Sequence, residues 1–342
     1  MSVKTIGGVR GFFSGAKNLE CLEILSPKNG LYSNARSGLY ALTQVCHWHR
    51  IWLPSFVCNT VLQPFEKANI ECNFYPVDRT LIADFTEVSI EEGDAVLLIS
   101  YFGVPTDASH YALLKAKGAC VIEDLSQAVY LAPSKLADFS VYSLRKFFAV
   151  PDGGVVISKG ELVDWPYTSS PNRVELLRAI EAIAGRSLFD AGLSDSKDWV
   201  SDFQKSEAAL VADLFPMSLF TKAQVAGSID IENDKAQRIK NFDYLLSELP
   251  EIALIQDRKG GVPLGFPIAL PNRDKVREML FKKEIYPPIH WNIKGVIPAE
   301  FTESHKLSSQ IMTIPCDGRY DLKDMQRIVA VLRSGRNCLN ND

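Results

Sequence analysis

The sequence lacks several features that mark whole classes of protein. Nowhere in its 342 residues do about 18 uncharged apolar residues follow one another, as a membrane-spanning helix requires. The first residues, from Met1 to Gly8, contain no apolar stretch ahead of a small-residue cleavage site, so a secretory signal is not expected. These absences favour a cytoplasmic protein.

Cysteine pairs are also missing. The seven cysteines are odd in number, lie far apart and form no C-x-x-C motif. This pattern disfavours both a disulfide framework and a zinc site, and no metal is expected.

Charge of one sign does not dominate either. The 37 basic and 41 acidic residues nearly balance, and no Lys/Arg block is present, so a nucleic-acid partner is not expected. No G-x-G-x-x-G follows an apolar run, which disfavours a dinucleotide-binding Rossmann-type protein. The 46% hydrophobic content can fill large cores, and a small-molecule partner fits the composition best.

What the sequence does contain is a series of short apolar runs with little alternation. Such runs are typical of strands that are buried on both faces of a sheet. Between the first two lies 107–118, a predicted helix with Asp107 at its N-cap and Gly118 just beyond its end. This βαβ unit predicts a parallel pair of strands. The four runs are 94–100, 119–123, 139–142 and 154–158.

The remaining periodicity indicates a helix at 36–49, capped by Ser33 or Asn34, and helical stretches from 161 to about 215. Beyond residue 222 a long helical stretch is followed by alternating strands and helices. We therefore predict an α/β protein with a large domain at 1–225, interrupted by a helical insertion at 161–215, and a smaller α/β domain at 226–342.

Two segments place polar side chains at a helix start or a strand end, where α/β sheets bind ligands. At residues 33–38, free backbone amides and the hydroxyl of Ser37 could bind a phosphate, or the segment could be an ordinary helix cap. At residues 121–127, Asp124 could hold a heterocyclic nitrogen protonated, or could cap the next segment. Gln127 shares the face of Asp124 if a helical turn follows.

A third segment places Lys146 between a predicted strand and a turn that contains Gly153 and Gly154. Its aromatic neighbours, Phe147 and Phe148, would partly desolvate the amine. Desolvation lowers the pKa of a lysine and makes it a better nucleophile toward a carbonyl. Read alone, a lysine in such a segment is most often a surface residue.

The order and spacing of these segments resemble the DegT/DnrJ/StrS group of sugar aminotransferases, which depend on pyridoxal phosphate (PLP) and have the aspartate-aminotransferase-like fold, fold type I. The most specific element is Glu-Asp-x-x-Gln at 123–127 with a downstream Lys-x7-Gly at 146–154. Supporting segments extend the resemblance over nearly the whole chain. They are Ala35-Arg-Ser-Gly-Leu39, Leu53-Pro-Ser-Phe56, Tyr75-Pro-Val-Asp78, Ser100-Tyr-Phe-Gly-Val-Pro-Thr-Asp107, Ile285-Tyr-Pro-Pro-Ile-His-Trp291 and the stretch from Ile314-Pro315 to Asp324-Met325.

The resemblance implies PLP as cofactor and a role for each matching residue. Lys146 falls on the Schiff-base lysine, and Asp124 on the partner of the pyridine nitrogen, which keeps the ring an electron sink. The other implied contacts are Gln127 at the ring's 3-oxygen, Ala35, Arg36 and Ser37 at the phosphate-binding helix start, Ser143 as a second phosphate-binding hydroxyl, Phe56 or Cys58 at the ring-stacking position, and His290 at the substrate.

The chain departs from the family pattern at four places. Two residues fewer separate Ser143 from Lys146, Cys58 stands at the position of the ring-stacking aromatic, and Asp152 replaces a glutamate before the glycine pair. The Asn-x-Arg segment that reaches the neighbouring subunit's cofactor is replaced by 214–219, Leu-Phe-Pro-Met-Ser-Leu.

By resemblance, the chain is expected to be a homodimeric aminotransferase. It would move an amino group from an amino acid, glutamate first, to the keto group of a nucleotide-linked sugar. Two alternatives stay open at this point. One is a PLP enzyme or PLP-binding protein that does not transaminate, and the other is a nucleotide-binding Rossmann-type protein without PLP.

Overall fold

The computed structural model describes residues 4–8, 23–160, 162–168, 173–227 and 230–339, and its centre is a seven-stranded sheet. The strand order across this sheet is β2-β8-β7-β6-β5-β3-β4. The strands are β2 (Gly30–Tyr32), β3 (Arg50–Pro54), β4 (Glu71–Tyr75), β5 (Ala95–Ile99), β6 (Cys120–Asp124), β7 (Phe139–Ser143) and β8 (Gly154–Ser158).

The direction of the strands confirms the predicted α/β class with a mostly parallel sheet. Strands β4, β3, β5, β6 and β7 pair in parallel, whereas β8 is antiparallel to both β7 and β2. All five residues of β5, Ala-Val-Leu-Leu-Ile, are buried. A strand covered on both faces needs an unbroken apolar run, which is why the sequence pattern located β5 to β8 within two residues.

Helices cover the sheet and join its strands. Helix α2 (Ala35–Val45) contacts β7 and β8, and α4 (Ala108–Ala116) contacts β6. The caps of α4 are as predicted: the Asp107 side chain accepts from the Ser109 N–H, and Gly118 has φ +74°. Shorter helical segments are η1 (Asn59–Val61), α3 (Gln63–Lys67), η2 (Tyr101–Gly103) and η3 (Leu144–Lys146).

Helix α2 ends earlier than the predicted 36–49. It stops at Val45, and Cys46 already has extended backbone angles. Residues 46–49 lead into β3, and Trp48 packs edge-on against Phe139 of β7 at 6.4 Å between ring centroids. Trp48 continues the helical period of the apolar residues, but it lies beyond the end of the helix and packs on the sheet instead.

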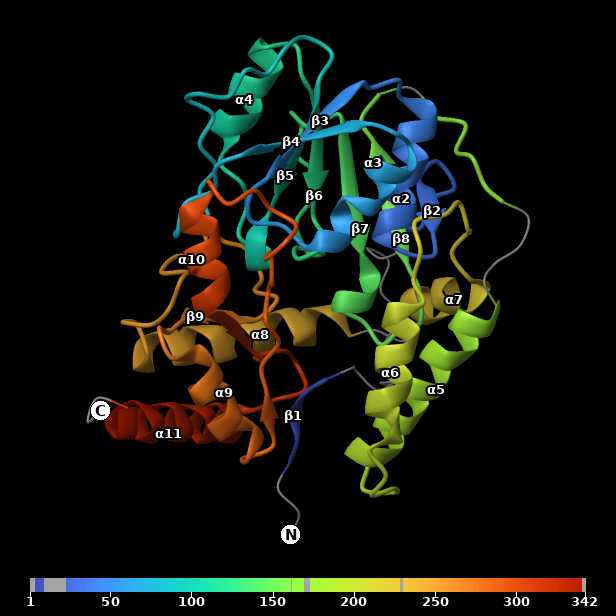
Figure 1. Cartoon of the computed structure of the whole chain (residues 1–342). Helices are drawn as coiled ribbons and strands as arrows, with labels where there is room; N and C mark the ends of the chain where they lie inside the picture. The colour runs from blue at the N-terminus through green and yellow to red at the C-terminus, as the bar shows by residue number, and fades with distance from the viewer. Residues whose placement is uncertain (1–3, 9–22, 161, 169–172, 228–229, 340–342) are drawn as a thin grey trace.

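The C-terminal part follows α7 (Leu219–Gly227) and the long helix α8 (Ile231–Glu248), which lies below the large sheet and above the last helix, α11, in Figure 1. It contains an antiparallel pair, β9 with β11, and a parallel pair in which β1 (Ile6–Gly7), from the start of the chain, joins β10. Its elements are β9 (Phe266–Ala269), α9 (Arg273–Phe281), β10 (Ile285–Tyr286), α10 (Thr302–Gln310), β11 (Ile311–Ile314) and α11 (Leu322–Leu339).

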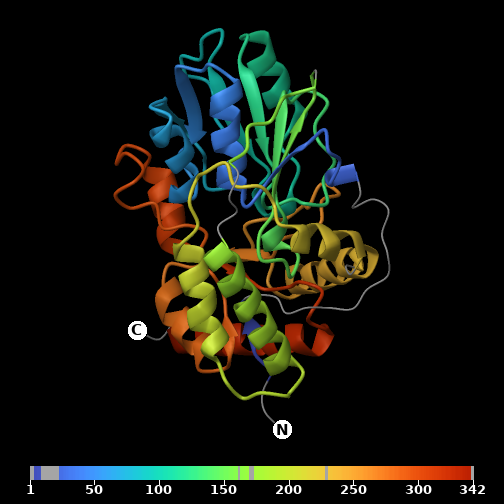
Figure 2. The ribbon, with the colours of Figure 1, turned by 90° about the vertical axis from the view of Figure 1, so that its right-hand side faces the viewer.

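The segment predicted as a helical insertion contains a hairpin of two helices, α5 (Arg173–Asp190) and α6 (Asp198–Ala208), packed side by side (Figure 2). The hairpin reaches the C-terminal elements: Lys197 pairs with Glu284 at 2.8 Å, and Arg186 donates to the Gly7 carbonyl at 2.5 Å. Buried Arg186 also stacks on Trp199, with 4.7 Å to the ring.

One hydrophobic cluster includes residues of both parts, among them Ile51 of β3, Leu98 of β5 and Met312 of β11. The division of the chain into domains at 225/226 stays a prediction. Within the described ranges, no helix is at once long and apolar enough to span a membrane.

Candidate active site

Strand β6 carries the first group of candidate residues at its carboxyl end. Asp124 is the last residue of the strand, only 7% exposed, and its Oδ1 accepts from the Ser126 N–H at 2.8 Å. Within the described part of the chain, its other carboxylate oxygen has no hydrogen bond. Asp124 therefore keeps one acceptor for a ligand.

Gln127, three residues further along the chain, is buried, and one end of its side-chain amide makes a hydrogen bond. Its Oε1 accepts from the Phe102 N–H at 2.8 Å, and Phe102 adopts φ +53°, an unusual conformation for a bulky residue. Its Nε2 is buried and has no hydrogen-bond partner among the residues that the structure describes. A buried amide donor without an acceptor costs about 1–3 kcal/mol, so this atom indicates a ligand oxygen.

Lys146 ends the short η3 turn that follows β7, and it is both accessible and electrostatically perturbed. Desolvation by the surrounding protein lowers the pKa of its amine. Attraction by Asp124 and Cys58 opposes this shift, and Arg145 and Arg36 reinforce it. A larger share of Lys146 is thus neutral, which is the nucleophilic form. Lys146 and Asp124 therefore lie close enough for the carboxylate to influence the amine, and their catalytic roles stay a prediction.

Ser143 ends β7, directly before the turn that carries Lys146. It is 6% exposed, pairs with Gly154 across the β7–β8 ladder, and its hydroxyl makes no hydrogen bond in the described segments. The shortened spacing from Ser143 to Lys146 is accommodated because a 3-10 turn begins at once. The free hydroxyl can still serve as a ligand donor.

The start of α2 lies against the turn after Lys146. Asn34 caps the helix by accepting from the Ser37 N–H at 3.0 Å, and Ser33 accepts from the Gly153 N–H at 2.7 Å. A Cβ on Gly154 would lie 2.1 Å from the Asn34 carbonyl oxygen, so only glycine allows this approach. The Lys-x7-Gly spacing thus holds the helix start of Ala35, Arg36 and Ser37 beside Lys146.

A segment that the sequence did not point to covers this helix start. We call residues 207–213 the strap; they run from the last turn of α6 toward Pro216, which forms a β-bridge with Tyr32. The Val211 carbonyl accepts from Asn34 Nδ2 at 3.1 Å, and the Leu210 carbonyl accepts from Arg36 Nη1 at 2.8 Å. Ser37 Oγ lies 3.3 Å from the Asp213 N–H, which donates to it.

Arg145 is the second residue that sequence reasoning missed. It precedes Lys146 on η3 and forms an ion pair with Glu207 of the strap. Burial and repulsion by Arg36 lower its pKa to about 10, against attraction by Asp152. The signal in the sequence that could have found it is a second basic residue directly before Lys146.

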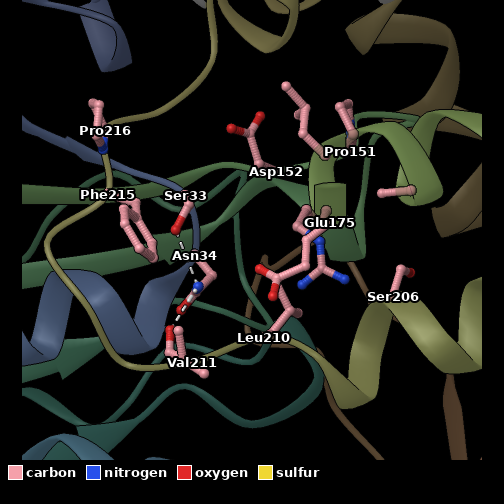
Figure 3. Close-up of a pocket in the computed structure, with 13 residues that line it drawn as sticks. Ser33, Asn34, Pro151, Asp152, Glu175, Ser206, Leu210, Val211, Phe215 and Pro216 are labelled. Atoms are coloured by element: carbon pink, nitrogen blue, oxygen red, sulfur yellow. Dashed lines mark hydrogen bonds between the residues drawn. The ribbon is translucent and has the colours of Figure 1, made fainter. Parts of the chain in front are cut away.

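Between the strap, α5 and β2 lies a small cavity of about 30 Å³ (Figure 3). Figure 3 shows Asn34 bridging Ser33 and Val211 at its edge. The volume suits about one water molecule and is far too small for a cofactor. Asp152, which also lines it, is held by Ser218 and by the Thr221 hydroxyl, and burial raises its pKa.

Aromatic side chains form another part of the surroundings. Phe56 is fully buried, 5.6 Å from Trp291 and 6.1 Å from Tyr101 between ring centroids, and the Tyr101 hydroxyl donates to the Phe56 carbonyl at 2.5 Å. Cys58 is half-buried beside Thr60 Oγ1 at 3.2 Å, and it lies close enough to Lys146 and Arg36 to influence the pKa of both. Which of Phe56 and Cys58 faces a cofactor ring stays a prediction.

His290 comes from the C-terminal part and completes the group around Lys146. Its Nδ1 lies 2.8 Å from Thr313 Oγ1, and its ring packs edge-on against Phe102 at 5.8 Å. Burial and the charge of Lys146 lower the pKa of His290 to about 3. The ring is therefore neutral at physiological pH.

The lowered pKa of His290 predicts a pH dependence of stability. An unfolded histidine takes up a proton below about pH 6.5, whereas the folded ring resists protonation down to about pH 3. His290 thus favours folding fully above pH 6.5, and this contribution is lost as the pH falls toward 3. We expect the melting temperature to fall less between pH 7 and pH 4.5 in His290→Gln than in the wild type. Exposed His47→Gln is the control, and an identical fall in all three proteins would contradict the assignment.

Metal chemistry has no candidate site in the structure as described: no group of three or more His, Cys, Asp or Glu side chains in those residues could hold a metal ion.

Among the comparisons with known proteins, only the comparison of structures finds proteins similar to this chain. No protein-family model and no curated protein sequence matches the chain. Many solved structures do. A DegT DnrJ EryC1 StrS aminotransferase from Brucella abortus has a TM-score of 0.66 and 14% identity over 94% of this chain and 91% of that one.

Two further structures show the same likeness. The aminotransferase TlmJ from Streptoalloteichus hindustanus has a TM-score of 0.68 and 15% identity over 96% of this chain and 93% of its own. The PLP-form of Spr1654 from Streptococcus pneumoniae, described as a sugar aminotransferase, has a TM-score of 0.65 and 11% identity over 98% of each chain. The sequence resemblance is thus confirmed for the fold: this chain has the α/β, type I fold of the DegT/DnrJ/EryC1/StrS sugar aminotransferases.

Proposed function

We propose that this protein is a PLP-dependent aminotransferase that transfers an amino group from an amino acid, glutamate being the expected donor, to the keto group of a nucleotide-linked sugar. The observation that carries the proposal is the convergence of three groups at the carboxyl ends of β6 and β7. These are Lys146 with its lowered pKa, Asp124 with a free oxygen, and the unpaired amide donor of Gln127. We propose further that the protein is cytoplasmic and forms a homodimer.

The residues present fit PLP. The buried Gln127 Nε2 needs an acceptor, which the 3-oxygen of the ring would supply, and the free oxygen of Asp124 suits a protonated ring nitrogen. Ser143 offers an unpaired hydroxyl to the phosphate, next to the amides at the start of α2. Lys146 supplies the amine that would hold the cofactor covalently.

When bound, PLP would supply an electron sink for negative charge at the substrate carbon attached to nitrogen. The chain's own residues would do the rest. Asp124 would keep the ring nitrogen protonated, and Lys146 Nζ would take the proton from the substrate α-carbon and return it at the cofactor's C4′ position. Neutral His290 would contact the substrate as a hydrogen-bond partner, because Thr313 fixes its ring through Nδ1.

The similar structures support this reading of the site. Those named above are described as aminotransferases, and Spr1654 was solved in both a PLP-form and a PMP-form. The Rossmann-type alternative has no support, because the sheet order differs from 3-2-1-4-5-6 and the similar structures have another fold. A second candidate is a PLP enzyme that does not transaminate. It is favoured by the segment Leu214–Leu219, where Phe215 and Met217 bond to strand β2 and its flank in place of an Asn-x-Arg.

A spectrum tests the proposal. The purified protein supplied with PLP should show an absorption band in the visible that borohydride removes. Glutamate should then convert this band to that of the pyridoxamine form, and a keto-sugar nucleotide should restore it. Protein that takes up no PLP would refute both candidates, whereas a PLP band that no amino donor converts would favour the second.

Gln127→Glu tests the ligand role of the amide. Glutamate keeps the acceptor for the Phe102 N–H but replaces the Nε2 donor with an oxygen that would repel the oxygen of the ring. The loss of one buried hydrogen bond, about 1–3 kcal/mol, corresponds to PLP affinity that is roughly 5- to 150-fold weaker. Titration by visible absorbance measures it, with exposed Gln44→Glu as control. Equal affinity in a folded Gln127→Glu protein would show that Nε2 faces no ligand.

A further inference from the structure

The strap occupies the hydrogen-bonding groups at the start of α2 with the chain's own backbone. Carbonyls of Leu210, Val211 and Ala212 accept from Arg36, from Asn34 and from Lys67, at 2.8–3.1 Å. Ser37 Oγ also has partners in the strap: it donates to the Val211 carbonyl at 3.4 Å and accepts from the Asp213 N–H at 3.3 Å. These are the side chains that surround the proposed phosphate position.

Positive charge is concentrated at the same place. Arg36, Arg145 and Lys146 lie close enough that Arg36 lowers the pKa of both Arg145 and Lys146, and Arg145 lowers that of Lys146. The positive end of the α2 dipole points toward this group. Mutual repulsion of the Arg36 and Arg145 guanidinium groups beside a helix start is costly without an anion to balance it.

Three further carboxylates lie near these basic groups. Asp152 is held by Ser218 and Thr221, Asp124 bonds to the Ser126 N–H through one oxygen, and Glu175 of α5 lines the same small cavity as Arg145. Glu207, on the strap, is the carboxylate that pairs with Arg145. The Glu207 side chain is 39% exposed as a whole, compared with 15% for Arg145, whereas its Oε1 atom, which faces Arg145, is buried.

We propose that the strap fills an anion-binding site of this protein when no ligand is bound. When a ligand binds, its phosphate group replaces the Glu207 carboxylate as the partner of Arg145. The ligand chemistry is a phosphate dianion, either free phosphate or the phosphate ester of PLP. The identification of PLP as the ligand rests on the proposed function; the exchange itself does not. Arg145 is thereby a phosphate-binding residue and Glu207 its competitor.

The strap can move without unfolding the site. Glu207 lies in the last turn of α6, and the strap's links to the large domain are hydrogen bonds and partly exposed ion pairs, such as Lys67 with Asp213 at 3.7 Å. Partly exposed ion pairs contribute little to stability, so their release requires little free energy. The hairpin stays anchored at its far end through Arg186 and Lys197, which keeps the strap close to the site.

Glu207→Gln tests the proposal in the full-length protein freed of cofactor. Inorganic phosphate is titrated by calorimetry and PLP by visible absorbance. Loss of the competing charge should tighten both by up to about fivefold, the range for a partly exposed ion pair. Glu181→Gln, the same charge change on an exposed part of α5, should leave both affinities as in the wild type.

Arg145→Gln separates exchange from a general change of charge. In that background both ligands should bind more weakly, and adding Glu207→Gln should no longer tighten them, because the two residues act through one contact. Unchanged affinities in Glu207→Gln, or equal tightening with and without Arg145, would overturn the proposal. Tightening of PLP alone would identify the ester as the ligand and support it. If the wild type takes up no PLP, the proposed function fails while the phosphate titration still decides the exchange.

Discussion

Lys146→Ala is expected to lose the borohydride-sensitive visible band and nearly all turnover. Without the Nζ atom the chain can neither hold PLP covalently nor move a proton between substrate and cofactor. General acid–base catalysis alone contributes about 10²–10⁴-fold, so turnover should fall by at least that factor. Absorbance after PLP loading and the rate of glutamate-dependent conversion measure the two effects.

Lys135→Ala is the matched control, since Lys135 is an exposed lysine on the loop before β7 and is not one of the candidate site residues. It should keep both the band and the rate of the wild type. A Lys146→Ala protein that retains the borohydride-sensitive band would place the covalent link on another residue and would refute the assignment.

Asp124→Asn is expected to keep much of the bound cofactor and lose most of the turnover. The amide still fits at the end of β6, but it cannot hold the ring nitrogen protonated, so the cofactor becomes a poor electron sink. A loss of roughly 10²-fold or more follows from removing a buried charge that stabilises the transition state. Attraction by Asp124 also raises the pKa of Lys146, so the variant should shift the pH profile of the remaining activity to lower pH. Single-turnover rates with glutamate across pH 6–9 measure both effects.

Exposed Asp195→Asn, on the turn between α5 and α6, carries the same charge change away from the site and should behave as the wild type. Near-normal turnover of a folded Asp124→Asn protein would contradict a role at the ring nitrogen. Loss of the cofactor band together with turnover would mean instead that Asp124 mainly holds PLP in place.

The sheet and the residues at its edge could be read from the sequence because each rests on a local pattern. Strands buried on both faces require mostly apolar runs. Asp124 and Gln127 lie at or just after the end of one such run, β6, and Lys146 lies three residues after the end of another, β7. The close approach of Gly154 to Asn34 gives the Lys-x7-Gly spacing a physical cause. A pattern of this kind survives in a chain that is only 11–15% identical to the solved structures of its fold described above.

The strap could not be read in this way. Its contacts with Arg36 and Ser37 join residues more than 170 positions apart, and most run through backbone carbonyls, which leave no trace in residue type. The Arg145–Glu207 pair joins two charged residues that look like ordinary surface side chains in the sequence. The end of α2 was predicted too late for a related reason, because Trp48 follows the helical period but packs on Phe139.

The pairing of β1 with β10 has a consequence for how the chain folds. Ile6 and Gly7 join Ile285 and Tyr286, and the Gly7 N–H donates to the Tyr320 hydroxyl at 2.8 Å. Strand β1 therefore cannot pair with β10 until Tyr286 has been synthesised. Contacts of such long sequence separation form late and slow folding. The C-terminal elements thus include a strand from far upstream in the chain, and the pairing of β1 with β10 is expected to be a late step in folding.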